Sequence, residues 1–456
     1  MARSTFHVVM YPWFAIGHIT PFLHLANKLA KRGNKVSFFC PTRAESKLKH
    51  LNCHPTLISF VPVVVPHVEG LPHGAETTGD ISVALGSLLM NAMDLTQTHI
   101  ELALRHLKPD IVFFDIIHWM PALASRLGIK SIHYSVVNSA YFGYVFAPAR
   151  KYSTDLLQPP PGFPPSTIKI YAHELQDFTV FTAKKKGERV SLQDRILIGM
   201  SGCDAITFRT CRELEGLYCD YIGNQFRKPV LLLGPAVPVP PTTVLEDRWA
   251  KWLSGFKAGS VVYCAFGSEC TLKKEQFQQV ILGLELTGLP FFAALKPPFG
   301  TETVEEALPE GFEERVEGRG VVHGGWVQQQ LILGHSSVGC FVTHCGYGSL
   351  SEALVNECQL VLLPHGGDQI LNARMMSGDL KVGVEVEKGE EGLFTKESVC
   401  KAVKSVMDQD SEIGTELRGN HANWRDFLLS KGFEASYFDG FIHKLEDMLG
   451  TDQREQ

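Results

Sequence analysis

The sequence predicts an α/β protein of two domains, each built on a doubly wound parallel β-sheet covered by helices. Short apolar strands alternate with amphipathic helices, a proline-rich segment interrupts the alternation near the middle of the chain, and the alternation then restarts. The chain has 456 residues, which is enough for two or three domains with large cores. A strand, helix, strand order implies right-handed crossovers and therefore parallel sheets.

The first strand is expected at residues 7–11 and is followed by a loop at 12–18. We expect the next helix to begin after Thr20, which suits an N-cap, with Pro21 in its first turn. Apolar residues recur every three or four positions until Gly33, which ends this helix. Further strands of the first domain are expected at 35–40, 111–114 and 130–134.

Residues 234–243 read GPAVPVPPTT, and their four prolines are typical of a linker. We therefore expect domains at 1–240 and 241–456, with the last helix packing back on the first domain. In the second domain, strands are expected at 261–265, 291–295, 339–343 and 359–363, and helices at 273–287 and 349–356. Two such sheets usually bind a ligand between them, at the carboxyl ends of their strands.

Composition excludes several classes of protein. Lys and Arg number 43 against 49 Asp and Glu, a net charge of −6, so a nucleic-acid or membrane-surface role is not expected. The 11 cysteines are scattered and form no CxxC pair, which favours a reducing compartment. The N-terminus does not resemble a secretory signal, and prolines interrupt the apolar run at 57–68. We expect a cytoplasmic protein with no membrane span.

The densest group of chemically distinctive residues lies between positions 326 and 369: Trp326, Gln329, His335, His344, Gly346, Ser349, Glu352, Pro364, Asp368 and Gln369. A strand ending at Thr343, a glycine turn and a helix starting near Ser349 would direct free N–H groups toward an anion such as a diphosphate. Alternatively, Ser349 and Glu352 form a capping box that only starts the helix. Trp326 could be a core residue, but the two glycines before it favour an exposed ring.

A dehydrogenase is another alternative. Gly346, Gly348 and Ser351 nearly match a dinucleotide-binding fingerprint, and Asp368 follows 20 residues after Gly348. The late position in the chain, the missing third glycine and the HGG sequence before Asp368 argue against it.

Two residues of the first domain suit proton transfer. His18 lies where a helix dipole disfavours the charged imidazolium, so its ring can act as a base. Asp115 follows the apolar run IVFF, where an unpaired carboxylate would be costly, so it needs a partner such as histidine. Alternatively, His18 is a helix-start residue without a role and Asp115 a turn residue at a strand end.

The 326–369 stretch resembles the plant secondary product glycosyltransferase box, the donor-site signature of family 1 UDP-sugar glycosyltransferases. The fold of that family is GT-B, two Rossmann-like domains facing a cleft, and the resemblance extends over nearly the whole chain. The segments MYPWF, GAETT, YCAFGSECTL and WVQQQL are similar to the subgroup of anthocyanidin 3-O-glucoside glucosyltransferases, which add a sugar to a sugar.

The resemblance implies that Trp326 stacks on uracil and that Gln329 and Glu352 bind the ribose hydroxyls. It implies that His344 and Ser349 bind the diphosphate. The other donor-binding residues that it implies are Val327, Gly346 and Gly348 in the box, Asp368 and Gln369 for the sugar hydroxyls, Ser268 on the phosphate side and Ser135 at the sugar.

The box departs from the family pattern at several positions. Gln328 replaces a proline, Tyr347 a tryptophan and Gly348 an asparagine, and 357–359 replace a Gly, apolar, Pro run. Loss of the asparagine removes one phosphate or sugar contact, which leaves the identity of the donor sugar open and uridine recognition intact.

His18 and Asp115 match the catalytic pair of the family, which implies an inverting transferase that uses UDP-sugar as co-substrate and no metal or other cofactor. Asp408 and Asp410 form a DxD pattern, which we interpret as a solvated turn far from the box. The expected acceptor is a phenolic glycoside and the expected donor UDP-glucose. UDP-rhamnose or UDP-xylose with a phenylethanoid or terpenoid glycoside is the alternative. A UDP-sugar sensor or carrier would not need the pair. We expect a monomer.

Overall fold

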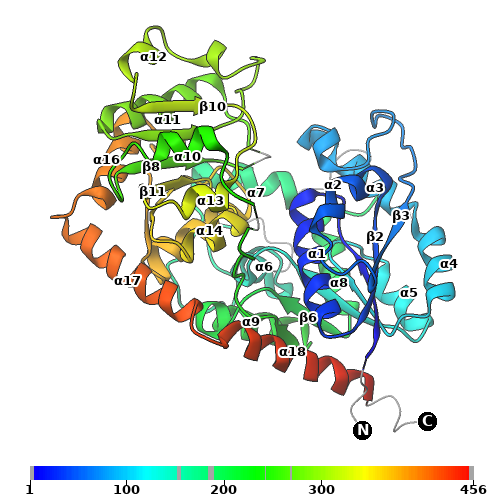
Figure 1. Ribbon diagram of the computed structural model, residues 1–456. Helices are drawn as coiled ribbons and strands as arrows, with labels where there is room; N and C mark the ends of the chain where they lie inside the picture. The colour runs from blue at the N-terminus through cyan, green and yellow to red at the C-terminus, as the bar shows by residue number, and fades with distance from the viewer. Residues whose placement is uncertain (1–4, 151–155, 183–188, 242, 268–269, 451–456) are drawn as a thin grey trace.

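Two parallel sheets form the framework of the protein, as a computed structural model shows (Figure 1). The structure describes residues 5–150, 156–182, 189–241, 243–267 and 270–450. Within these residues, one sheet has the strand order β3-β2-β1-β4-β5-β6-β7 and the other β10-β9-β8-β11-β12-β13. The order reverses between β1 and β4 and between β8 and β11, the kind of position at which open α/β sheets bind ligands.

The first sheet and its helices come from the first half of the chain. Its strands are β1 (His7–Tyr11), β2 (Lys35–Pro41), β3 (Ile58–Val63), β4 (Ile111–Phe114), β5 (Lys130–Ser135), β6 (Ala205–Phe208) and β7 (Val230–Leu232). Its helices are α1 (Ile16–Lys31), α2 (Thr42–Leu48), α3 (Gly86–Asp94), α4 (Gln97–Leu107), α5 (Met120–Arg126), α6 (Ser139–Val145), α7 (Leu175–Thr182), α8 (Leu192–Gly202) and α9 (Arg212–Phe226).

The second sheet comes from the second half. Its strands are β8 (Val261–Ala265), β9 (Phe291–Ala294), β10 (Gly320–His323), β11 (Val338–Thr343), β12 (Gln359–Leu362) and β13 (Gly383–Glu385). Its helices are α10 (Asp247–Leu253), α11 (Lys274–Thr287), α12 (Phe312–Arg315), α13 (Gln329–Leu333), α14 (Tyr347–Leu354), α15 (Asp368–Arg374), α16 (Lys396–Met407) and α17 (Glu412–Leu428). The last helix of the chain, α18 (Phe433–Gly450), packs on the first sheet instead.

The strands are apolar along their whole length because both faces of each sheet are covered. All four residues of β4 are buried. Along β1, Val8 and Met10 pack into one apolar cluster, whereas Val9 and Tyr11 pack into another. This alternation is the period of two expected of a strand with a separate core on each face.

The predicted start of the first helix is wrong. α1 begins at Ile16, and Thr20 and Pro21 lie inside it. The backbone N–H groups of His18 and Ile19 already donate to the Ala15 carbonyl across 2.9 and 2.8 Å, so the first turn is complete before Pro21 is reached. Pro21 cannot donate a hydrogen bond to the carbonyl four residues before it, yet the helix continues past it to Lys31. As a consequence, His18 lies in the first turn of α1, whereas the sequence predicts it at the end of the preceding loop.

Two other helix starts differ slightly from prediction. α14 begins two residues earlier than expected, because the chain turns at the N-cap Gly346. α11 begins one residue later than expected, because Lys273 has extended backbone and forms the N-cap.

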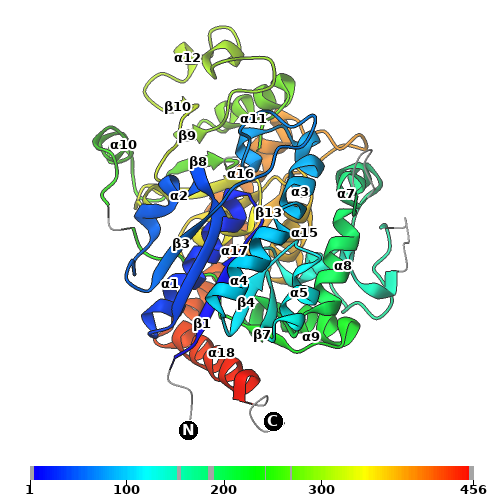
Figure 2. The same cartoon turned by 90° about the vertical axis from the view of Figure 1, so that its right-hand side faces the viewer.

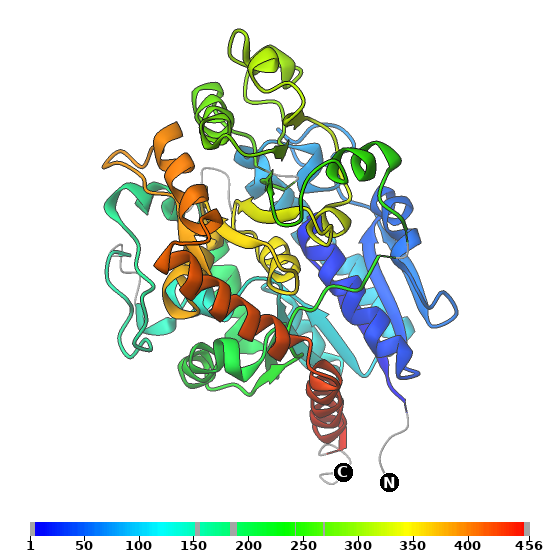
Figure 3. The ribbon, with the colours of Figure 1, turned by 60° about the vertical axis from the view of Figure 1, so that its left-hand side comes forward.

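The chain passes from the first sheet to the second and then returns. The described residues between β7 and α10 form neither helix nor strand. At the C-terminal end, α17 leads to α18, which packs against β7 below the first sheet (Figures 2 and 3). Phe438, Phe441 and Leu445 of α18 are buried in the same apolar cluster as Val8 of β1. In the part of the chain that the structure describes, no helix is both long and apolar enough to cross a membrane.

Candidate active site

The loops at the carboxyl ends of the two sheets touch each other. Asn138, which follows β5, donates a side-chain hydrogen bond to Asn372 in α15. The Tyr347 hydroxyl at the start of α14 lies 2.9 Å from Glu215 Oε1 in α9. These contacts bring together the ends of strands from both sheets, where the candidate site residues lie.

His18 and Asp115 form a hydrogen-bonded pair in the first half of the molecule. His18 Nδ1 lies 2.6 Å from Asp115 Oδ2, although the residues are 97 positions apart. Asp115 ends up beside α1 because β4, which precedes it, pairs with β1. Asp115 is only 2% exposed, and its Oδ1 accepts hydrogen bonds from the backbone N–H groups of Trp13 and Ile116. The buried carboxylate is therefore fully hydrogen-bonded.

This arrangement determines the tautomer of the histidine. An ionised carboxylate can only accept hydrogen bonds, so the Nδ1 of His18 must carry the proton that it shares with Asp115. In the neutral ring, Nε2 then carries a lone pair and can accept a proton. The His18 side chain is 27% exposed, so its ring remains accessible, whereas the Asp115 carboxylate is buried.

Gln329, Ser349 and Glu352 lie together at the junction of α13 and α14. Gln329 Nε2 lies 3.0 Å from Ser349 Oγ and 2.7 Å from Glu352 Oε2. The capping box, which was the alternative interpretation of Ser349 and Glu352, does not form, since the N-cap of α14 is Gly346 and no side-chain hydrogen bond caps the helix. Burial raises the pKa of Glu352 above its usual value, against hydrogen bonds from Gln329 and Gln330 that lower it.

Trp326 and Val327, which precede Gln329 in the chain, differ in how far their side chains are exposed. The Trp326 side chain is 79% exposed, which agrees with the prediction of a free ring. Val327 is buried, and its carbonyl accepts a hydrogen bond from the backbone N–H of Gln329 across 2.9 Å. Trp326 is thus an exposed aromatic ring whose position in the chain is fixed by the buried Val327 next to it.

His344 occupies a space that two glycines leave open. A Cβ atom on Gly346 would lie 2.5 Å from His344 Nε2, and one on Gly267 would lie 3.0 Å from Cε1. Such distances are far shorter than van der Waals contact, so neither position tolerates a side chain without movement. Burial lowers the pKa of His344 to about 4. The ring is therefore neutral at pH 7 and can offer a phosphate a hydrogen bond but no charge.

The start of α14 presents unpaired backbone donors beside this ring. The N–H of Leu350 bonds to the Gly346 carbonyl, so the N–H groups of Tyr347, Gly348 and Ser349 precede the first bond within the helix. The first turn contains no acidic residue. Gly348 is exposed, and a Cβ there would meet nothing within 4 Å. This helix start can therefore bind an anion.

Asp368 and Gln369 begin α15 directly after Gly367, whose positive φ of 58° favours glycine. Asp368 Oδ2 accepts a hydrogen bond from Asn372 Nδ2 across 3.1 Å, and Gln369 Oε1 accepts one from the His365 backbone N–H. On the opposite side of the interface, Ser135 ends β5, is buried and donates its hydroxyl proton to the Val137 carbonyl across 2.8 Å. Ser268 lies outside the described residues.

An open groove of about 870 Å³ lies next to this end of the site, lined by residues from both halves of the chain. Tyr171 and Glu174 contribute to one side, and Pro364 and Lys388 to the other. Lys388 Nζ donates to the Pro364 carbonyl across 2.6 Å, which fixes the segment leading to Asp368. None of the candidate catalytic or donor-binding residues lines this groove, so it is a neighbouring feature and not part of the candidate site.

The DxD pattern lies in the turn between α16 and α17. Asp408 and Asp410 are exposed, and the Asp410 backbone N–H donates to Asp408 Oδ1 across 3.0 Å. Among the described residues, no group of three or more His, Cys, Asp or Glu side chains is arranged to hold a metal ion.

Sequence reasoning missed the polar residues that connect the two halves. Asn138 precedes a helix and suits an N-cap, a role that it fills by accepting a hydrogen bond from Tyr141. The N-cap pattern in the sequence does not indicate that Asn138 also contacts Asn372. Glu215 lies on α9, and its burial could not be read from a helical pattern of charged residues.

Comparison with known proteins decides the family. Residues 314–414 match the family described as UDP-glucoronosyl and UDP-glucosyl transferase. A cyanidin 3-O-galactoside 2''-O-xylosyltransferase from Actinidia chinensis var. chinensis is 60% identical over 99% of this chain and 100% of its own length. An anthocyanidin 3-O-glucoside 2''-O-glucosyltransferase from Ipomoea purpurea is 56% identical over 98% of this chain and 99% of its own length.

The chain belongs to the plant family 1 UDP-glycosyltransferases. The family resemblance predicted from the 326–369 box is therefore confirmed, and the dehydrogenase alternative is not supported. Like its relatives, this UDP-glycosyltransferase is an enzyme that uses a UDP-sugar as co-substrate.

Solved structures confirm the predicted GT-B fold of this UDP-glycosyltransferase. A UDP-glucose:anthocyanidin 3-O-glucosyltransferase in complex with UDP superposes with a TM-score of 0.80 at 24% identity, over 99% of this chain and 100% of the other. Glycyrrhiza uralensis UGT73P12, complexed with glycyrrhetinic acid 3-O-monoglucuronide, gives a TM-score of 0.80 at 20% identity, over 99% and 97%.

Proposed function

We propose that this enzyme transfers a sugar, with inversion at the anomeric carbon, from a UDP-sugar to a sugar hydroxyl of a small phenolic glycoside such as an anthocyanidin 3-O-glucoside. The hydrogen-bonded pair of His18 and Asp115 is the observation that carries the proposal, because it provides a base with a defined tautomer. The two relatives support the acceptor, since they are a cyanidin 3-O-galactoside xylosyltransferase and an anthocyanidin 3-O-glucoside glucosyltransferase.

In the proposed mechanism, His18 Nε2 takes the proton of the acceptor hydroxyl as that oxygen attacks the anomeric carbon of the donor. The new carbon–oxygen bond forms as the bond from that carbon to the UDP oxygen breaks, and UDP leaves. Asp115 orients the ring through Nδ1 and balances the positive charge that develops on it. The buried, fully hydrogen-bonded carboxylate can do this without moving.

The leaving diphosphate is stabilised in this proposal by the start of α14. The N–H groups of Tyr347, Gly348 and Ser349 and the positive end of the helix face an anion there. Neutral His344 adds a hydrogen bond. These donors are fixed before the reaction, so they need no reorganisation when charge develops on UDP.

The remaining box residues bind the donor in the proposed complex. Trp326 stacks on uracil, Gln329 and Glu352 bind the ribose hydroxyls, and Val327 supports this segment. The sugar is bound by Asp368 and Gln369, with Ser135 and Ser268 as further contacts. We retain UDP-glucose as the proposed donor, and UDP-xylose is the second candidate because the relative of 60% identity is named a xylosyltransferase.

A donor panel tests the proposal. Purified enzyme is incubated with cyanidin 3-O-glucoside and, separately, UDP-glucose, UDP-xylose, UDP-rhamnose or UDP-galactose, with and without EDTA. The proposal expects one diglycoside product that forms equally well in EDTA. Activity lost to EDTA and restored by manganese would contradict the metal-independent mechanism. Transfer to the free anthocyanidin but not to its glucoside would contradict the proposed acceptor.

A further inference from the structure

The side-chain amides of Asn138 and Asn372 form a buried contact between the two halves of the enzyme. Asn138 is 1% exposed and Asn372 is fully buried. Asn138 Nδ2 donates to Asn372 Oδ1, although the residues are 234 positions apart. Asn138 starts α6 and Asn372 lies in α15, two helices that pack against each other.

Each amide has its orientation fixed by its other hydrogen bonds. Asn138 Oδ1 accepts from the Tyr141 backbone N–H across 2.7 Å, which leaves only its NH₂ group to face Asn372. Asn372 Nδ2 donates to the Cys345 carbonyl across 2.9 Å and to Asp368 Oδ2 across 3.1 Å. An NH₂ group has two hydrogens, and both are used here. Rotating either amide by half a turn would break at least two bonds.

The contact therefore runs from the first half of the molecule to a carboxylate of the donor site. Asp368 is held by Asn372, and Asn372 is held by Asn138. The same Asn372 amide also holds Cys345, which is the second residue after β11 and leads into the start of α14. A shift of Asn138 relative to α15 would thus change where the Asp368 carboxylate points.

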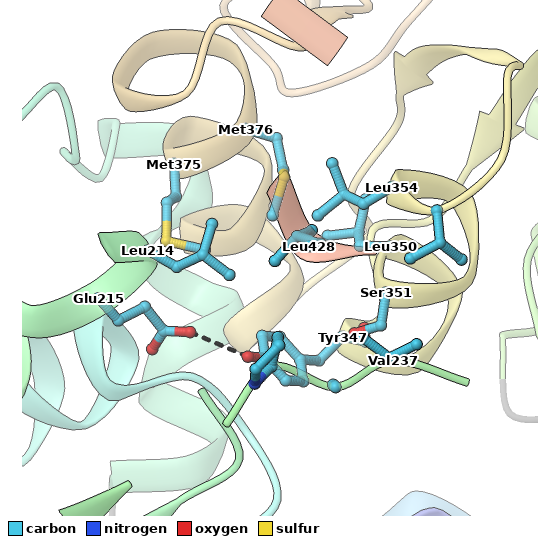
Figure 4. Close-up of a pocket in the computed structure, with 13 residues that line it drawn as sticks. Leu214, Glu215, Val237, Tyr347, Leu350, Ser351, Leu354, Met375, Met376 and Leu428 are labelled. Atoms are coloured by element: carbon cyan, nitrogen blue, oxygen red, sulfur yellow. Dashed lines mark hydrogen bonds between the residues drawn. The ribbon is translucent and has the colours of Figure 1, made fainter. Parts of the chain in front are cut away.

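A second contact joins the adjacent residue of α6 to the phosphate side of the site. Ser139 donates its backbone N–H and its hydroxyl to Glu215 Oε2 across 2.6 and 2.7 Å. The Tyr347 hydroxyl reaches the other oxygen of Glu215, as Figure 4 shows beside the apolar pocket of Leu350 and Met376. The start of α6 is therefore bound to α14 through Glu215 and to α15 through Asn372.

We propose that Asn138 and Asn372 are positioning residues for the donor sugar: they hold the Asp368 carboxylate in the orientation that selects which UDP-sugar reacts. The inference rests on the proposed role of Asp368 in binding the sugar. Neither asparagine is proposed to touch the reacting atoms. Through Asn138, the choice of donor sugar at Asp368, in the second half of the chain, depends on a residue of the first half.

Two variants test this without removing the cap of α6. Asn138→Asp and Asn138→Ser both retain a side-chain oxygen for the Tyr141 N–H, since Asp and Ser are good N-caps. Asn138→Asp presents an acceptor to Asn372 Oδ1 where a donor was, and Asn138→Ser replaces the amide with a single, shorter hydroxyl in place of the NH₂ group that bonds to Asn372. We expect the ratio of kcat/KM for UDP-glucose to that for UDP-xylose to change by about 10-fold, because small displacements of positioning groups have large effects. The Kd of UDP, which lacks the sugar, should change by less than about twofold.

Tyr218→Phe is the matched control. The Tyr218 hydroxyl donates to Asp379 Oδ2 across 2.5 Å, which is another hydrogen bond between the two halves, but it ends on Asp379 and not on Asn372 or Asp368. This variant should leave the donor ratio unchanged. A change as large as that of Asn138→Asp would mean that any loosening of the interface alters donor choice, and it would overturn the inference.

A double-mutant cycle distinguishes positioning from a purely structural effect. Asp368→Asn should itself change the donor ratio, and Asn138→Asp added to it should cause little further change, because both act through one carboxylate. Independent, multiplicative changes would overturn the inference, as would an unchanged ratio in both folded Asn138 variants. In these cases the wild type still transfers sugar, so the proposed function survives. A wild type that transfers from no UDP-sugar would contradict the proposed function and this inference with it.

Discussion

Gln329 donates to Glu352 across 2.7 Å, so the first residue of α13 is bound to the carboxylate that follows it on α14. Its amide also lies 3.0 Å from Ser349 Oγ. The proposed ribose ligands are therefore already next to each other without a nucleotide, and the exposed ring of Trp326 lies three residues before Gln329. Each of these features gives a measurable expectation.

Glu352→Gln should stabilise the nucleotide-free enzyme at pH 7. Burial raises the pKa of Glu352 above its usual value, so the folded state disfavours the charged carboxylate, and the amide removes that cost. A group with a raised folded pKa contributes stability below its unfolded pKa and loses it as pH rises through the folded value. The gain in Tm over wild type should thus be present at pH 7 and vanish near pH 4. A gain in Tm of equal size at pH 7 and pH 4 would contradict this account of Glu352.

The same variant should bind UDP less tightly. Replacing the carboxylate loses charged hydrogen bonds to ribose, which are worth about 1.5 to 3 kcal/mol. Calorimetry on the folded variant measures this directly. Unchanged affinity would remove Glu352 from the proposed ribose site.

Trp326→Ala should weaken UDP binding by about 1 to 3 kcal/mol, the usual effect of losing an aromatic ring beneath a base. Because the side chain is 79% exposed, its loss should leave the Tm of the free enzyme nearly unchanged. Trp326→Phe is the matched variant, since it keeps a stacking ring and should retain most of the affinity. Equal affinities for wild type and Trp326→Ala would show that uracil binds elsewhere.

Gly346→Ala and Gly348→Ala should behave differently although they lie two residues apart. A methyl group at Gly346 would lie 2.5 Å from the His344 ring, whereas one at Gly348 meets nothing within 4 Å. We expect Gly346→Ala to be destabilised by about 1 to 3 kcal/mol, as overpacked sites are, and to bind UDP poorly. Gly348→Ala should fold at least as stably as wild type. Chemical unfolding of both variants checks this, and equal stabilities would show that His344 moves freely.

The fold could be predicted from the sequence to the extent that single elements carry a local signal. The apolar run of β4 and the proline-rich segment after β7 indicated their roles directly. The start of α1 could not be predicted, because no side chain caps it and Thr20 with Pro21 give a stronger local signal inside the helix. There, hydrogen bonds to the Ala15 carbonyl decide the outcome.

The candidate site, like the fold, has a part that could be predicted from local sequence and a part that could not. Residues of the 326–369 box are adjacent in sequence, so their grouping could be predicted from the chain alone. The contact of Asn138 with Asn372 joins segments 234 residues apart and depends on how the two sheets meet. The pairing of His18 with Asp115 lies between these cases, since a buried carboxylate at a strand end needs a partner but the sequence does not fix its distance.

The catalytic pair makes a prediction about Asp115→Asn. The new amide oxygen can still accept from the Trp13 and Ile116 N–H groups, so its NH₂ group would face His18 Nδ1. This would place the ring proton on Nε2, the atom that has to accept the acceptor proton. We expect turnover to fall by about 10² to 10⁴-fold, with UDP affinity unchanged.

The most direct test of the central claim is a kinetic comparison of wild type, His18→Ala, Asp115→Asn and the double variant on one phenolic glucoside, with folding checked by circular dichroism. If the pair acts as one base, His18→Ala loses about 10² to 10⁴-fold in kcat with UDP binding intact, and the double variant is little worse than the poorer single one. A fully active His18→Ala enzyme would contradict the mechanism, and fully multiplicative losses would separate Asp115 from it.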